Sequence, residues 1–141
     1  MTRVAFIKDL HTMLGLPKPL SRTDSFHKDM IMKYESLRDK LLERGITTIV
    51  FTGDLFQVKA PSKYDLNAVS LYDWLFLELW GDFDKYTIRG NHDMYMTKDG
   101  TPANSIFELG VKHGWYKTLE GTPLITDDLV VFGLDFRANI S

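Results

Sequence analysis

The chain has 141 residues, 44% hydrophobic and 13% aromatic, which fits one domain with a buried core and excludes a disordered chain. Its formal net charge of −2 excludes a globally basic nucleic-acid binder, so any DNA contact has to come from local patches. Cysteine is absent, which excludes disulfides and thiolate metal sites and leaves oxygen and imidazole nitrogen as metal ligands.

The first third of the chain predicts a strand, a helix and a second strand. Residues 3–7 are apolar and β-branched, too few for a helix, and predict a buried strand. Residues 24–44 carry apolar side chains at helical spacing between charged ones, which predicts an amphipathic helix. Residues 46–51 predict another buried strand, so the order implies a parallel crossover. Thr23 or Asp24 can cap the start of the helix, and Gly45 can end it.

The rest of the chain predicts two more helices and several strands. Residues 64–80 predict a helix whose second half is too apolar for one face, so we expect it to be covered on two sides. Gly81 ends this helix, and residues 85–88 predict a third strand. A short helix over residues 104–109 is expected to end at Gly110. Short strands are expected at residues 115–118, 123–126 and 129–132, the last two joined by a hairpin turn at Asp127-Asp128.

Side chains able to bind a metal follow each of the first three strands. The carboxyl ends of parallel strands meet at one edge of a sheet, so we expect these side chains to converge. In an extended chain, alternate side chains point to the same side, which predicts that Asp9 and His11 share one cation. Each stretch alone could be a simple turn, but all three in order favour a metal site. The candidate residues are Asp9, His11, Asp54, Asn91, His92 and Asp93.

The donor types predict a site for two hard cations. Asp54 follows Gly53, which lets the backbone and the carboxylate approach an ion closely. A carboxylate can bridge two cations, which in two-metal hydrolytic sites lie about 3.5–4 Å apart. The amide oxygen of Asn91 suits manganese, magnesium or iron better than a metal that prefers soft ligands. His92 is then free to act on a substrate.

These three motifs give the chain a family resemblance. Asp9-Leu10-His11, Gly53-Asp54 and Gly90-Asn91-His92-Asp93 resemble the first three motifs of the calcineurin-like metallophosphoesterases. Further similarity points to the nuclease subunit of SbcCD-type double-strand-break repair exonucleases, through Gly53-Asp54-Leu55-Phe56, Pro61-Ser62 and Arg22-Thr23-Asp24-Ser25-Phe26. The resemblance implies an α/β fold: the βαβαβ start of a two-sheet sandwich, with residues 1–141 as one partial domain.

The resemblance also implies a role for each candidate residue. Asp9 and His11 would bind the first of two divalent cations, Asp54 would bridge both, and Asn91 would bind the second. Manganese is the first expectation, with magnesium or iron as alternatives. His92 would contact the scissile phosphate and protonate or stabilise the leaving oxygen. Asp93 would hold the loop or orient its neighbour.

Two departures from the family pattern limit what the resemblance implies. The family completes its site with a fourth-motif histidine and a Gly-His-x-His, and neither occurs before Ser141, so we expect a truncated or split domain with an incomplete site. The one later histidine, His113, is expected in a solvated turn after a helix. Gln57 stands where related enzymes often carry His or Asp in support of the catalytic histidine, and an amide cannot exchange a proton there.

Three functions remain open at this point. The first is a DNA exo- or endonuclease of the SbcCD type, with an SMC-like coiled-coil ATPase as the partner that the family implies. The second is a general phosphatase or nucleotide phosphodiesterase. The third is a non-catalytic fragment that associates through an exposed apolar face, with a second copy or with a missing C-terminal part. The chain shows no signal-peptide core and no apolar stretch of about 20 residues, so we expect a soluble, cytoplasmic protein without membrane contact.

Overall fold

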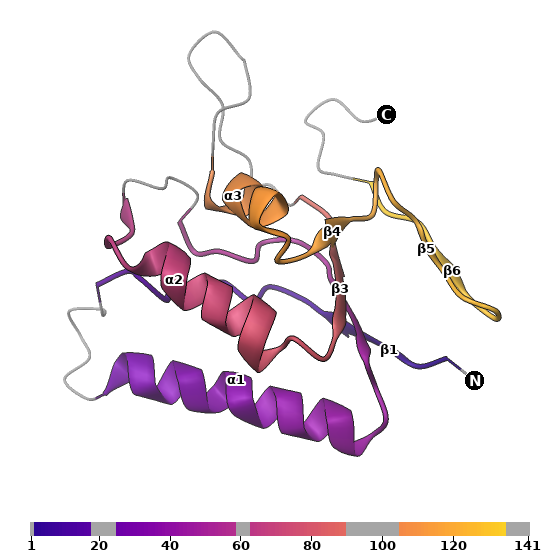
Figure 1. Ribbon diagram of the computed structural model, residues 1–141, viewed down its shortest axis with the longest axis horizontal. Coiled ribbons are helices and arrows are strands. Elements are labelled where there is room, and N and C mark those ends of the chain that lie inside the picture. The colour runs from indigo at the N-terminus through magenta and orange to yellow at the C-terminus, as the bar shows by residue number, and fades with distance from the viewer. Residues whose placement is uncertain (1, 18–24, 59–62, 90–104, 135–141) are drawn as a thin grey trace, which may run out of the picture.

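The computed structural model describes residues 2–17, 25–58, 63–89 and 105–134. Its centre is a parallel sheet of four strands that lie side by side in chain order, with three helices on one face and a hairpin on the other (Figure 1). The strands are β1 (Val4–Ile7), β2 (Thr48–Phe51), β3 (Asp84–Thr87) and β4 (Lys117–Thr118). The helices are α1 (Phe26–Glu43), α2 (Ala68–Asp73) and α3 (Ile106–His113), and the hairpin joins β5 (Leu124–Ile125) to β6 (Val130–Val131).

The strands alternate their side chains between two apolar layers. Ile49 and Phe51 of β2 are fully buried beneath the helices, whereas Val50 faces a smaller cluster on the other side of the sheet. Because β2 is covered on both faces, all four of its residues are buried, as expected for a strand inside a parallel sheet. The prediction of an α/β fold that begins with a parallel βαβαβ unit is therefore confirmed.

Helix α1 packs one apolar stripe against the sheet. Tyr34 and Leu41 are buried, and the helix ends at Arg44, followed by Gly45 with a left-handed φ of 71°. This confirms the predicted end, since glycine adopts that conformation without the steric cost of a Cβ atom. The residue that begins the helix is Ser25, which makes no side-chain capping bond, while Thr23 and Asp24 lie outside the described residues.

The second helical segment changes its winding partway along. Helix α2 continues directly into a π-helix, η2 (Trp74–Leu79), where the Trp80 backbone N–H donates to the Leu75 carbonyl at 2.9 Å. In a π-helix, residues four and five apart lie on the same side, so Leu75, Phe76, Leu79 and Trp80 are all buried. The segment is covered on two sides, as expected: Trp80 meets Tyr34 of α1, and Phe76 stacks on Trp115 at 5.4 Å and 13°.

A lysine closes the end of this segment. The Lys85 ammonium donates to the backbone carbonyls of Trp80 and Phe83, both at 2.9 Å. Burial lowers the pKa of Lys85, while Asp84 and Asp82 act in the opposite direction. The ammonium thereby bonds to the carbonyl of Trp80, where the helical segment ends, and to that of Phe83 in the turn that follows.

Helix α3 differs from its prediction. It runs through Gly110 to His113 and ends at Gly114, whose φ is 76°. Gly110 lies against Tyr116 and Trp115, where a larger residue has no room. This glycine therefore allows close packing inside the helix and does not end it. The Ser105 side chain caps the start by accepting from the Glu108 backbone N–H at 3.1 Å.

The end of the described chain forms the predicted short strands. Strand β4 joins the parallel sheet, and β5 and β6 pair as an antiparallel hairpin. Leu124 and Val131 face the sheet, whereas Ile125, Val130 and Phe132 are exposed. Among the described residues, no helix has the length and apolar character that a membrane span requires.

Candidate metal centre

The structure brings Asp9, His11 and Asp54 together at the carboxyl edge of the sheet. β1 and β2 pair in parallel with Ile7 opposite Phe51, so the loops that follow begin side by side. Ligand atoms of the three side chains all lie within 4.8 Å of one another, and His11 Nε2 lies 4.0 Å from Asp9 Oδ1. The predicted convergence of the first two motifs therefore holds in space.

The local backbone is not the extended chain that the sequence argument assumed. Asp9, His11 and Asp54 all have left-handed backbones, with φ of 51°, 43° and 53°. This conformation is uncommon outside glycine and costs of order 1–3 kcal/mol per residue, so the surroundings must hold it. The His11 N–H donates to the Asp54 carbonyl at 3.0 Å, and the Thr52 N–H donates to the Ile7 carbonyl at 2.9 Å. Turn geometry, not strand alternation, places these side chains.

The donor set fits a divalent cation that prefers hard ligands. Two carboxylates and one imidazole match the oxygen and nitrogen ligands of manganese, magnesium or iron. The Asp9 and His11 side chains are 48% and 36% exposed, which leaves the group open to an ion and to a substrate. Asp9, His11 and Asp54 would hold the ion, which when bound would polarise a phosphoryl oxygen and offset negative charge.

The third predicted motif lies outside the described residues. Gly90, Asn91, His92 and Asp93 therefore remain sequence-based candidates. The strand that leads to them is in place, because β3 pairs with β2 in register and the Ile88 N–H donates to the Phe51 carbonyl at 3.3 Å. The third strand thus ends beside the strand that delivers Asp54.

The residue before this motif is fixed to α3. The Arg89 guanidinium makes a two-point ion pair with Glu108, with Nε–Oε1 at 2.5 Å and Nη2–Oε2 at 3.1 Å. Its carbon Cζ also lies 5.3 Å from the centre of the Phe107 ring. Both partners of the ion pair are largely buried, 23% and 32% exposed. The pair joins the end of β3 to the first turn of α3.

Three other polar residues lie apart from the Asp–His–Asp group. Gln57 is exposed, and its backbone N–H donates to the Thr12 carbonyl at 3.1 Å. His27 of α1 is partly buried, and its Nε2 bonds to the Leu16 carbonyl at 2.8 Å. His113, expected in a turn, is the last residue of α3, and its Nδ1 lies 3.1 Å from Asp73 Oδ1. Neither histidine belongs to the metal-binding group.

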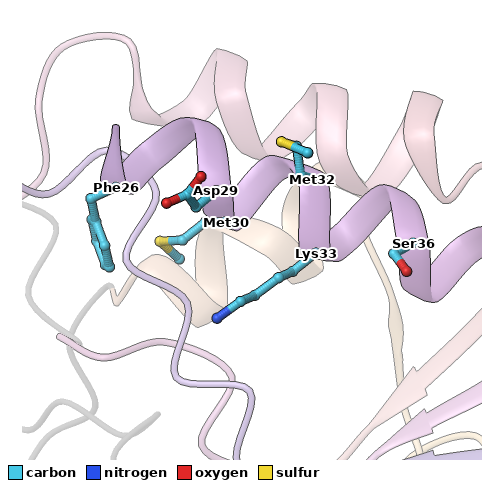
Figure 2. Close-up of a pocket in the computed structure, with 6 residues that line it drawn as sticks. All are labelled: Phe26, Asp29, Met30, Met32, Lys33 and Ser36. Atoms are coloured by element: carbon cyan, nitrogen blue, oxygen red, sulfur yellow. The ribbon is translucent and has the colours of Figure 1, made fainter. Parts of the chain in front are cut away.

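A groove lies along α1, with a volume of about 350 Å³. Figure 2 shows the Phe26 and Lys33 side chains extending to the same side of the helix. Among the described residues, none of the predicted metal ligands lines it, and its ionisable groups are one carboxylate and one ammonium. The groove is therefore not the metal centre. Its lining residues are Phe26, Asp29, Met30, Met32, Lys33 and Ser36.

Thr12 and Tyr34 support the metal-binding group, although no sequence motif singles them out. Thr12 is fully buried directly after His11, and its Oγ1 accepts from the Tyr34 hydroxyl at 2.7 Å. The only sequence signals are a polar β-branched residue beside a ligand and a tyrosine in the apolar stripe of α1. Neither signal indicates that the two residues meet across 22 positions.

The family comparison agrees with the geometry. No curated protein matches the chain. The family model described as calcineurin-like phosphoesterase matches residues 2–138, almost the whole sequence, and includes every predicted motif. Members of this family hydrolyse phosphoesters with divalent metal ions, in agreement with the carboxylate–imidazole group at the strand ends. The chain therefore belongs to the calcineurin-like phosphoesterase family.

Proposed function

We propose that this chain is a divalent-metal-dependent phosphodiesterase of the SbcCD nuclease type, with DNA as its substrate. The observation that carries the proposal is the grouping of Asp9, His11 and Asp54 within 4.8 Å at the ends of two paired strands. The DNA substrate and the nuclease subfamily are supported by the resemblance of residues 53–56, 61–62 and 22–26. Manganese is the proposed metal.

Each site residue has one task in the proposed reaction. Asp9 and His11 would hold the first ion, Asp54 would hold both, and Asn91 would hold the second. His92 would contact the scissile phosphate and protonate or stabilise the leaving oxygen. Bound ions would supply neutralisation of the charge that develops on the phosphoryl oxygens.

The proposed partners follow from the same resemblance. They are DNA and an SMC-like coiled-coil ATPase, with self-association or a C-terminal companion chain as further candidates. The exposed Ile125, Val130 and Phe132 of the hairpin support association through an apolar face. Sedimentation at increasing concentration would test self-association, which predicts a rising average mass.

Hydrolysis assays with a matched pair of charge-removing variants test the function. Asp54→Asn removes the bridging carboxylate, while Asp127→Asn removes an exposed carboxylate in the β5–β6 turn. With manganese, we expect the parent to cleave linear DNA and a chromogenic phosphodiester, Asp54→Asn to lose more than about 100-fold, and Asp127→Asn to keep the parental rate.

Three results would change the proposal. Turnover of the small phosphodiester without DNA cleavage would favour a general phosphatase or nucleotide phosphodiesterase. No hydrolysis by the parent at any manganese concentration would exclude catalysis by this chain alone and favour an interaction module. Equal activity of the Asp54→Asn variant and the parent would show that the Asp–His–Asp group is not the catalytic centre.

A further inference from the structure

Thr12 joins the two loops that carry the metal-binding side chains. Its backbone N–H donates to the Leu55 carbonyl at 2.8 Å, and its carbonyl accepts from the Gln57 N–H at 3.1 Å. These bonds form a short parallel bridge between Thr12 and Phe56. Thr12 directly follows His11, and Leu55 directly follows Asp54. The bridge therefore fixes each ligand loop one residue beyond its ligand.

The side chain of Thr12 connects this bridge to helix α1. Its Oγ1 accepts from the Tyr34 hydroxyl at 2.7 Å, and both residues are buried. Tyr34 is itself fixed, because its ring lies 5.4 Å from the Trp80 ring and its carbonyl accepts from the Trp80 indole N–H at 3.1 Å. The position of Thr12 is thus set from the interior of the protein.

A second tyrosine fixes the turn that follows. The Tyr72 hydroxyl donates to the Leu14 carbonyl at 2.7 Å, and the Tyr72 ring packs against Phe56 at 5.1 Å. Burial raises the pKa of Tyr34 to about 12 and raises the pKa of Tyr72 further. Both phenols stay protonated at every pH at which the protein would work, so both remain hydrogen-bond donors.

The length of the Thr12–Tyr34 bond matters for the metal centre. The hydroxyl oxygens lie 2.7 Å apart, whereas two carbon atoms in van der Waals contact lie about 3.5–4.0 Å apart. Without the hydrogen bond, the carbon atoms that remain make no directional contact, so the loop and the helix are no longer held at one fixed separation. A metal site tolerates only about 0.5 Å of displacement of its ligands. His11 is adjacent to Thr12, and its left-handed backbone leaves it dependent on its neighbours.

We propose that Thr12 and Tyr34 are positioning residues of the metal centre: their buried hydroxyl–hydroxyl bond holds His11 at the distance from Asp54 that a shared divalent cation requires. The inference rests on the metal centre of the proposed function. It adds residues that do not touch the ion, one in the loop and one in helix α1. Mutation of residues that hold metal ligands in place typically changes metal affinity about 10- to 100-fold.

Four variants of the full chain separate positioning from plain structural support. Thr12→Val keeps the shape of the side chain but leaves the buried Tyr34 hydroxyl without this acceptor, so it should lower both the melting temperature and manganese affinity. Adding Tyr34→Phe removes the stranded hydroxyl and should restore most of the melting temperature, because an apolar pair of the same shape is nearly neutral for stability. Thr12→Ser keeps the hydroxyl and should keep manganese affinity. Tyr116→Phe removes another buried phenol, one that donates to the Phe107 carbonyl away from the ligand loops, and should leave manganese affinity unchanged.

Manganese affinity by calorimetry and melting temperature without metal are the two readouts. We expect the double variant to melt close to the parent yet bind manganese about 10- to 100-fold more weakly. Recovery of affinity together with stability in the double variant would overturn the inference and leave the proposed function intact. A parent chain that binds no manganese would overturn both.

Discussion

Gly110 offers a test in which packing and helix propensity predict opposite results. It lies within α3, and a Cβ atom added there would be 2.3 Å from the Tyr116 hydroxyl oxygen and 2.5 Å from Trp115 Cε3. Real Cβ atoms essentially never come this close to another heavy atom, so both aromatic rings have to move. Gly110→Ala therefore forces the junction between α3 and β4 to repack.

The expected loss is about 3 kcal/mol of unfolding free energy. Propensity alone favours alanine over glycine in a helix interior by about 1 kcal/mol. Overpacking a tight core costs about 1–3 kcal/mol. Displacing Tyr116 also breaks its 2.9 Å hydrogen bond to the Phe107 carbonyl, which adds about 1–3 kcal/mol for a buried polar group. The two costs exceed the gain, and for a chain of this size the melting temperature should fall by about 10 °C.

Urea and thermal denaturation of the parent, Gly110→Ala and Gly121→Ala measure this effect. Gly121 is the matched control, because the nearest atom to an added Cβ there is 3.9 Å away. We expect Gly121→Ala to melt within about 2 °C of the parent, as surface substitutions usually do. A Gly110→Ala protein that melts at or above the parental temperature would show that propensity prevails and that the α3 packing described above is incorrect.

Three further predictions concern other parts of the fold. Phe76→Ala should cost about 3–5 kcal/mol in urea denaturation, since Phe76 is fully buried among aromatic rings; a loss below 1 kcal/mol would contradict that packing. Glu108→Gln should cost about 1–3 kcal/mol by removing the charge from a largely buried ion pair with Arg89, and the loss should disappear in an Arg89→Met background. Bonds from Thr2 hold the pKa of Asp128 at about 2, below its usual 3.8, so ionised Asp128 stabilises the fold above pH 4, and this contribution is lost as the pH falls toward 2. Melting curves from pH 5 down through pH 2 should therefore show Asp128→Asn less stable than the parent at pH 5, with the difference shrinking as the pH falls through 2; a constant difference would refute the assignment.

The strands and the first helix could be predicted because their signals are local. Short β-branched runs do not suit helices, and the apolar spacing of residues 26–43 matches one helical face. The strand–helix–strand order then implies a parallel crossover, which brings the ends of the first two strands to one edge of the sheet. Asp9, His11 and Asp54 reach that edge through this topology, and the turns after the strands bring their side chains close together.

The errors arise where tertiary contacts override local signals. Gly110 is predicted to end the helix, yet α3 continues through it. A glycine is needed there because Tyr116 and Trp115 occupy the space where a side chain would lie. Strand alternation predicts an extended chain from Asp9 to His11, whereas both residues have left-handed backbones, and the His11 N–H donates to the Asp54 carbonyl of the second loop. In both cases the contacting residues are not sequence neighbours of the residue that they hold.

Polar side chains were the least predictable part of the site. A histidine or a threonine carries no periodic signal, so His27 and Thr12 could be placed only once the loop after β1 was seen to fold over α1. The π-helical turn is similar, because its sequence, residues 74–79, reads as an ordinary apolar helix. Such features depend on which partners the fold supplies.

The position of β1 at the edge of the sheet has a consequence for local opening. β1 pairs with β2 along Val4–Ile7, and no other strand of the described sheet flanks it. Edge strands of this kind open more easily than central ones, and here opening would carry Asp9 and His11 away from Asp54. A cation bound by all three side chains would hold the end of β1 to the end of β2 and so oppose this opening. The exchange rates of the β1 amide protons would then report directly on metal occupancy.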